Sequence, residues 1–89
     1  MIIRKTGKER WHYSGQLAWA LKRIAGEENN HVIDKVEWEL VNTDKFAQDF
    51  MCKFVANFYE NAILIYRISG KAVYLGGSVQ LLISDKIVY

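Results

Sequence analysis

Hydrophobic and polar positions alternate along residues 35–40, where the order is Lys-Val-Glu-Trp-Glu-Leu. A period of two places Val36, Trp38 and Leu40 on one side, as in a half-buried strand. A helix would instead align Val32, Val36 and Leu40, but the β-branched and aromatic content favours the strand. The pattern therefore predicts a strand over residues 35–40.

A second pattern, with a period near 3.6, extends from Ser14 to about Ala25. Its apolar residues are spaced by four and three positions and fall on one face: Leu17, Leu21 and Ile24. Ser14 is a suitable N-cap, and Gly26 is the expected left-handed stop. This pattern predicts an amphipathic helix whose apolar face packs on the core.

The longest periodic segment is predicted to run from about Asp44 to Glu60. Phenylalanines recur in it every four residues: Phe46, Phe50, Phe54 and Phe58. Thr43 precedes the segment as an N-cap, and Asn61 is an acceptable stop. Since a spacing of four is typical of one helix face, the segment predicts a second helix that supplies much of the core.

Short strands separated by glycine turns account for the other residues. An N-terminal hairpin is predicted from two strands, Met1–Lys5 and Glu9–Tyr13. Three strands are predicted after Asn61, followed by a turn and a short terminal strand: 62–68, 71–75, 78–83 and 87–89. Ser69-Gly70 and Gly76-Gly77 would form the turns between the first three of these strands.

These elements predict a single α+β domain that covers residues 1–89. The expected order is ββαβαβββ, with a mostly antiparallel sheet of four to six strands and the two helices packed on it. The chain contains no proline, and no linker or internal repeat divides it. We therefore expect every segment to belong to one compact unit.

Composition adds a charge asymmetry to this prediction. The 89 residues are 51% hydrophobic and 25% charged, an ordinary globular balance, and the net charge is only +2. Residues 1–25 hold six Lys or Arg against one Glu, whereas residues 26–50 hold seven Asp or Glu against two Lys. The basic and acidic thirds are expected either to contact a charged partner or to neutralise each other within the fold.

Other features exclude several classes of protein. No apolar run approaches the roughly 18–20 residues of a membrane span, and the N-terminus lacks the pattern of a signal peptide. Cys52 is the single cysteine, which excludes an internal disulfide and fits a reducing cytoplasm. The glycine pairs lack the pattern of a phosphate loop, and no pair among His12, His31 and Cys52 has metal-ligand spacing. We expect no cofactor, no metal and no enzymatic activity.

The first predicted helix carries a candidate contact surface. On a helical wheel Trp19 lies opposite the core face, between Lys22 and Arg23. Trp and Arg are over-represented among interface hot spots, although other segments folding over Trp19 would also explain it. Acidic residues, Glu37 and Glu39 among them, form a second candidate surface suited to a basic partner. These features favour a cytoplasmic protein-binding regulator or inhibitor of the immunity-protein, antitoxin or phage host-factor-inhibitor type.

Nucleic-acid binding is the alternative function. Cations and aromatics are interleaved near the N-terminus: Arg4, Lys5, Lys8, Arg10, Trp11 and Tyr13. The cations would neutralise phosphates and the rings would stack on bases, unless Trp11 and Tyr13 face the core. The pI of 8.7 argues against this function, because dedicated nucleic-acid binders usually exceed about 9.

Two further hypotheses remain open. His12, His31 and Lys22 supply the groups of a metal-independent ribonuclease, but nothing in their spacing requires such a site. The terminal strand, residues 87–89, has no proline to protect an edge, so it predicts a homodimer formed by strand pairing.

Overall fold

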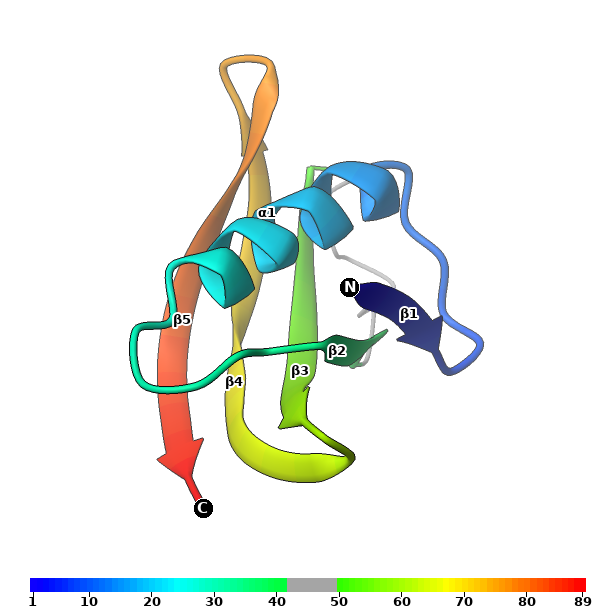
Figure 1. Ribbon diagram of the computed structural model, residues 1–89. Helices are drawn as coiled ribbons and strands as arrows, with labels where there is room; N and C mark the ends of the chain where they lie inside the picture. Colours follow the sequence, from blue (N-terminus) through cyan, green and yellow to red (C-terminus); the bar gives the residue numbers. More distant parts are fainter. Residues whose placement is uncertain (42–49) are drawn as a thin grey trace.

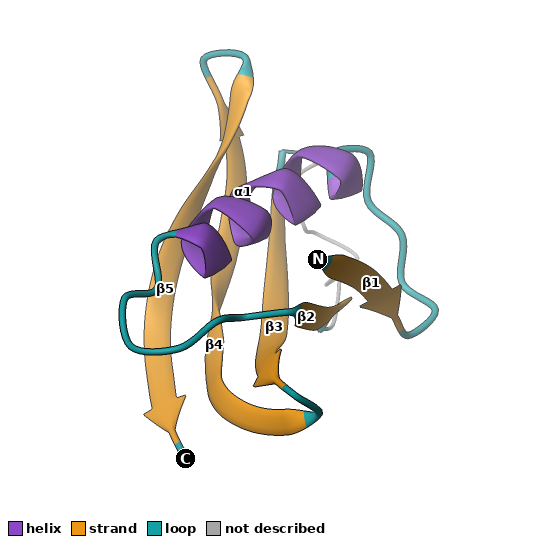
Figure 2. Ribbon diagram, in the orientation of Figure 1, coloured by secondary structure: helices purple, strands orange, loops and turns teal. Residues whose placement is uncertain are grey.

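The computed structural model describes residues 1–41 and 50–89. Its elements in chain order are β1 (Ile2–Thr6), α1 (Ser14–Gly26), β2 (Lys35–Leu40), β3 (Met51–Glu60), β4 (Ile63–Leu75) and β5 (Ser78–Val88). The fold is α+β: a mixed five-stranded sheet with α1 lying across one face (Figures 1 and 2).

The strands lie in the sheet in chain order, β1-β2-β3-β4-β5. The pairing of β1 with β2 is parallel, and the other three pairings are antiparallel. A parallel pair needs a crossover connection, which α1 provides between β1 and β2 (Figure 1). The topology leaves β1 and β5 as the two edges of the sheet.

The predicted strand at residues 35–40 is confirmed as β2. Val36, Trp38 and Leu40 are buried beneath α1, while Glu37 and Glu39 lie on the opposite face. The alternation thus identified both the strand and its buried side.

The first predicted helix is also confirmed, with different ends. Leu17 and Leu21 are fully buried, as the helical wheel predicts. The predicted cap at Ser14 is wrong, because its hydroxyl donates to the Trp11 carbonyl oxygen (2.8 Å) and Tyr13 is the N-cap. Gly26 is the last helical residue, and it does not have the left-handed backbone expected of a stop.

The predicted N-terminal hairpin is wrong. Residues 9–13 form no strand, and β1 pairs with β2 instead. Gly7 does have a left-handed backbone (φ 77°), but the chain then leads into α1 while Trp11 packs against the core. The reason is that β2 offers β1 a partner whose register brings Ile3 beside buried Val36.

The predicted helix at residues 44–60 is wrong from residue 51 onward, where the chain forms β3. Residues 44–49 lie outside the described part of the chain. Four is a multiple of two, so phenylalanines spaced by four also fall on one face of a strand. Phe54 and Phe58 are fully buried on the α1 side of the sheet, with Cys52 and Ala56 on the same face.

The C-terminal strands are longer than predicted. Ser69-Gly70 lies inside β4, opposite a bulge in β5, rather than in a turn, and β5 continues through Ser84–Lys86. The Gly76-Gly77 turn is confirmed, with φ values of 61° and 88°. The observed order is therefore βαββββ in place of ββαβαβββ.

Side chains on the two faces of the sheet differ in character. The face beneath α1 holds the core, where Phe58 and Tyr66 stack with ring centroids 4.5 Å apart. On the opposite face, called the open face below, one row crosses the sheet through Arg4, Glu37, Asn57 and Arg67. Within this row the Arg67 Nε donates a hydrogen bond to Asn57 Oδ1 (2.7 Å).

No helix in the described residues is long and apolar enough to cross a membrane.

Candidate functional site

Trp19 projects from α1 away from the core, as predicted, with 63% of its surface exposed. The guanidinium carbon of Arg23 lies 5.5 Å from the centre of the indole ring, within range of a cation–π contact. Arg23 follows Trp19 by four residues, so one helical turn places the two side chains together. Lys22 is exposed on the same helix.

Two adjacent hollows lie between α1 and β5. One, of about 210 Å³, is lined by Trp19 and Gln16 from the helix and by Ser78 from the strand. The other, of about 190 Å³, extends toward Ile24 and Leu81. Both hollows share four residues: Ala20, Arg23, Val79 and Gln80. We call these two adjoining hollows together the α1–β5 groove.

The groove lies beside an edge strand with unpaired backbone groups. The Val79 amide donates to Gln16 Oε1 (3.2 Å), so it points away from β4. Outward groups alternate along a strand, and a residue's N–H and C=O point to the same side. Leu81 and Ile83 therefore also present their amides and carbonyls at the free edge of β5. Gln16 protects only the first of these positions.

The C-terminal half of β5, together with Tyr89 directly after it, exposes apolar side chains on both faces of the sheet. Each of these large apolar residues is at least 43% exposed: Leu82, Ile83, Ile87, Val88 and Tyr89. Long, apolar edge strands are normally shortened, charged or covered, because they are templates for pairing with another chain. Here Asp85 and Lys86 are the only charges on β5.

Glu37 and Glu39 do not join Trp19, Lys22 and Arg23 in one surface. Both glutamates lie on the open face, on the other side of the sheet from α1. The Glu37 carboxylate forms an ion pair with Lys35 (3.4 Å). The residues proposed from the sequence as partner-binding therefore form two separate surfaces.

The interleaved N-terminal cations and aromatics are also spread apart. Arg4 lies on the open face, while Lys8 and Arg10 are exposed in the segment that precedes α1. The Tyr13 ring stacks on Tyr74 with centroids 3.9 Å apart and planes 5° apart. Trp11 packs against the core and meets Tyr13 edge-on. One face of the Tyr13 ring is thus already covered.

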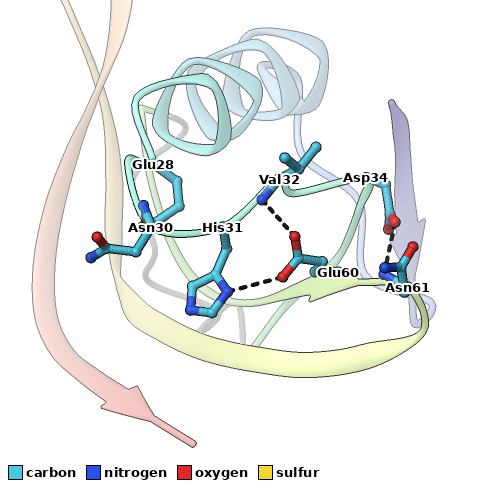
Figure 3. Close-up of polar contacts among 7 residues, drawn as sticks. All are labelled: Glu28, Asn30, His31, Val32, Asp34, Glu60 and Asn61. Atoms are coloured by element: carbon cyan, nitrogen blue, oxygen red, sulfur yellow. Dashed lines mark hydrogen bonds and ion pairs between the residues drawn. The ribbon is translucent and has the colours of Figure 1, made fainter.

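His31 belongs to a polar cluster that sequence patterns did not reveal (Figure 3). The Glu60 carboxylate contacts His31 Nδ1 (2.9 Å) through one oxygen and accepts from the Val32 amide (2.8 Å) through the other. These contacts, mainly the Val32 amide, lower the pKa of Glu60. Nearby, Asp34 accepts from the Asn61 amide (2.8 Å). These contacts hold the segment that follows α1 against the end of β3.

The other candidate chemical groups are dispersed. His12 and His31 lie beyond opposite ends of α1, whose 13 residues span about 20 Å at 1.5 Å per residue. Cys52 is buried, and this burial, with the charge of Glu9, raises the pKa of its thiol. In residues 1–41 and 50–89, no group of three or more His, Cys, Asp or Glu side chains is arranged to hold a metal ion.

Comparisons with protein-family models, curated proteins and solved structures found no match.

Proposed function

We propose that the protein is a non-catalytic protein-binding module that takes an extended segment of its partner at β5. The observation that carries this proposal is the free edge of β5, with outward amides at Leu81 and Ile83, next to the α1–β5 groove. A peptide strand added to such an edge gains main-chain hydrogen bonds, and adjoining pockets select its side chains.

Charge and exposure define the chemistry of the partner segment. Side chains of an added strand alternate between the two faces, and β5 offers apolar contacts on both. Arg23 lines both hollows of the groove on the helix side, so a carboxylate of the segment placed beside Arg23 would be favoured. We therefore infer an extended segment with alternating apolar residues and an acidic residue placed near Trp19 and Arg23.

The single free, buried cysteine supports a cytoplasmic location for this module. A small protein that covers a partner's segment in this way would act as a regulator or an inhibitor.

Selection from random linear peptides tests the proposal. The displayed peptides should be about as long as the 11 residues of β5. We expect enriched sequences with alternating apolar positions and a carboxylate, and binding at least about tenfold weaker to Trp19→Ala, since Trp is a common hot spot. Glu37→Gln, on the open face, is the matched control and should bind as the wild type does. Failure to enrich any peptide, or equal loss in both variants, would contradict the proposal.

A further inference from the structure

The open face carries a cavity that lies away from the α1–β5 groove. It measures about 580 Å³ and lies over β3, β4 and β5. That volume falls within the roughly 300–1,000 Å³ typical of small-molecule sites. Its walls combine apolar side chains, including Val41, Val55 and Leu82, with two lysines, Lys53 and Lys71.

The two lysines lie directly opposite each other on β3 and β4. Directly opposed residues of an antiparallel pair have Cβ atoms about 5 Å apart, and like charges at such positions are destabilising. No ion pair joins either lysine to any residue in the described part of the chain. Lysines often protect sheet edges, but β3 and β4 are interior strands, so that role does not explain the pair.

A bulge shapes the floor of the cavity. The register between β4 and β5 shifts at Ser69 and Gly70, which leaves Ser84 as the extra residue on β5. A Cβ on Gly70 would overlap the Leu82 carbonyl oxygen, so only glycine fits there. The Ser84 hydroxyl donates to the Ser69 carbonyl oxygen (3.2 Å) and fixes this distortion. Bulges of this kind are over-represented beside functional sites.

We propose that this cavity binds a small organic anion, in which an oxyanion group is joined to an apolar body. Lys53 and Lys71 would share the oxyanion, which removes their mutual repulsion. Val41, Val55 and Leu82 would cover the apolar body. A carboxylate and a phosphate monoester both satisfy this chemistry. The cavity lies on the other face of the sheet from the α1–β5 groove, although Leu82 and Ile83 of β5 line it as well.

Four probes test whether binding needs both an anion and an apolar chain, and whether the anion is a carboxylate or a phosphate. Octanoate and octyl phosphate carry both an anion and a chain, whereas 1-octanol and inorganic phosphate each lack one of them. Each probe is titrated into isotope-labelled protein while the amide signals of Val55, Ser69 and Leu82 are followed by NMR. We expect at least one of the two amphiphilic anions to shift these signals with saturation, and both half-ligands to bind at least about tenfold more weakly. The stronger anion identifies the source as a carboxylate or a phosphate.

Charge removal provides the second arm of the test. Lys53→Gln combined with Lys71→Gln should weaken binding of the better anion at least about tenfold, while Lys22→Gln on α1 should leave it unchanged. Without ligand, the double variant should unfold at a higher urea concentration than the wild type, because the opposed charges are gone. The proposal is overturned if neither amphiphilic anion shifts the three signals, if binding survives in the double variant, or if 1-octanol binds equally well.

Discussion

At the scale of single residues, Trp19 is exposed on the outer side of α1, whereas His31 contacts a residue far away in the sequence, Glu60. Trp19 points outward because its angle on α1 follows from residues within one turn of it, which the sequence contains. The partner of His31 could not be found in the same way, because Glu60 is 29 positions away and only the pairing of β2 with β3 brings the two together. Local periodicity carries no information about such contacts.

The contacts of Glu60 with His31 and Val32 predict that the segment after α1 becomes less stable at low pH. Because contacts with Val32 and His31 lower the pKa of Glu60 below its ordinary value of 4.5, ionised Glu60 stabilises the segment above that pH. The stabilisation is lost as the pH falls further and the carboxylate takes up a proton. We expect the Val32 amide to exchange faster with solvent in Glu60→Gln, measured by hydrogen exchange. Asp34→Asn should leave Val32 protected, and equal exchange in the wild type and Glu60→Gln would contradict the prediction.

The raised pKa of Tyr66 predicts that the folded protein loses stability at high pH. Burial, with a contribution from Glu28, raises the pKa of Tyr66 from 10.0 to about 12. The folded state therefore keeps a proton that the unfolded state releases, so stability is complete below pH 10 and decreases as the pH rises toward 12. A shift of this size corresponds to about 2–3 kcal/mol. Urea unfolding should show a smaller decrease over this range in Tyr66→Phe, and parallel decreases in both proteins would contradict the assignment.

At the scale of elements, periods that a second signal supports were predicted correctly. Residues 35–40 admit a helix as well as a strand, but their β-branched and aromatic content favours the strand that forms, and the period of α1 is supported by its helical spacing. The phenylalanines spaced by four fit both, and strand pairing decides between them: β3 lies between β2 and β4 and contributes Phe54 and Phe58 to the core. Likewise Ser69-Gly70 has the composition of a turn, but pairing on both sides keeps β4 continuous.

Two phenylalanines that would share a face in a helix have different environments here. Phe54 is fully buried in β3, whereas Phe50 is 43% exposed. We expect Phe54→Ala to lower the free energy of unfolding by about 3–5 kcal/mol, because it leaves a cavity in the core. Phe50→Ala should have a much smaller effect. Both are measured by urea denaturation followed by circular dichroism, and equal losses would favour the helical arrangement.

At the scale of the whole molecule, the free edge of β5 also predicts self-association. An antiparallel strand edge is self-complementary, so two copies related by a two-fold axis can pair β5 with β5. In the absence of a partner we expect sedimentation velocity to show a dimer that accumulates at high micromolar concentration. Ile83→Pro should stay monomeric, because its outward amide is lost. A wild-type protein that is monomeric at every concentration would contradict the prediction.

Two substitutions of Ile83 test most directly whether a partner segment pairs with the backbone of β5. The Ile83 amide points away from β4, so Ile83→Pro removes an outward donor without removing a ladder hydrogen bond, which edge strands tolerate. Ile83→Ala shortens the side chain but keeps the donor. Affinities of both variants for one selected peptide are measured by calorimetry, after circular dichroism shows that both are folded. We predict binding about tenfold or more weaker for Ile83→Pro than for Ile83→Ala. Equal affinities of the two folded variants would show that the partner does not pair with the edge of β5.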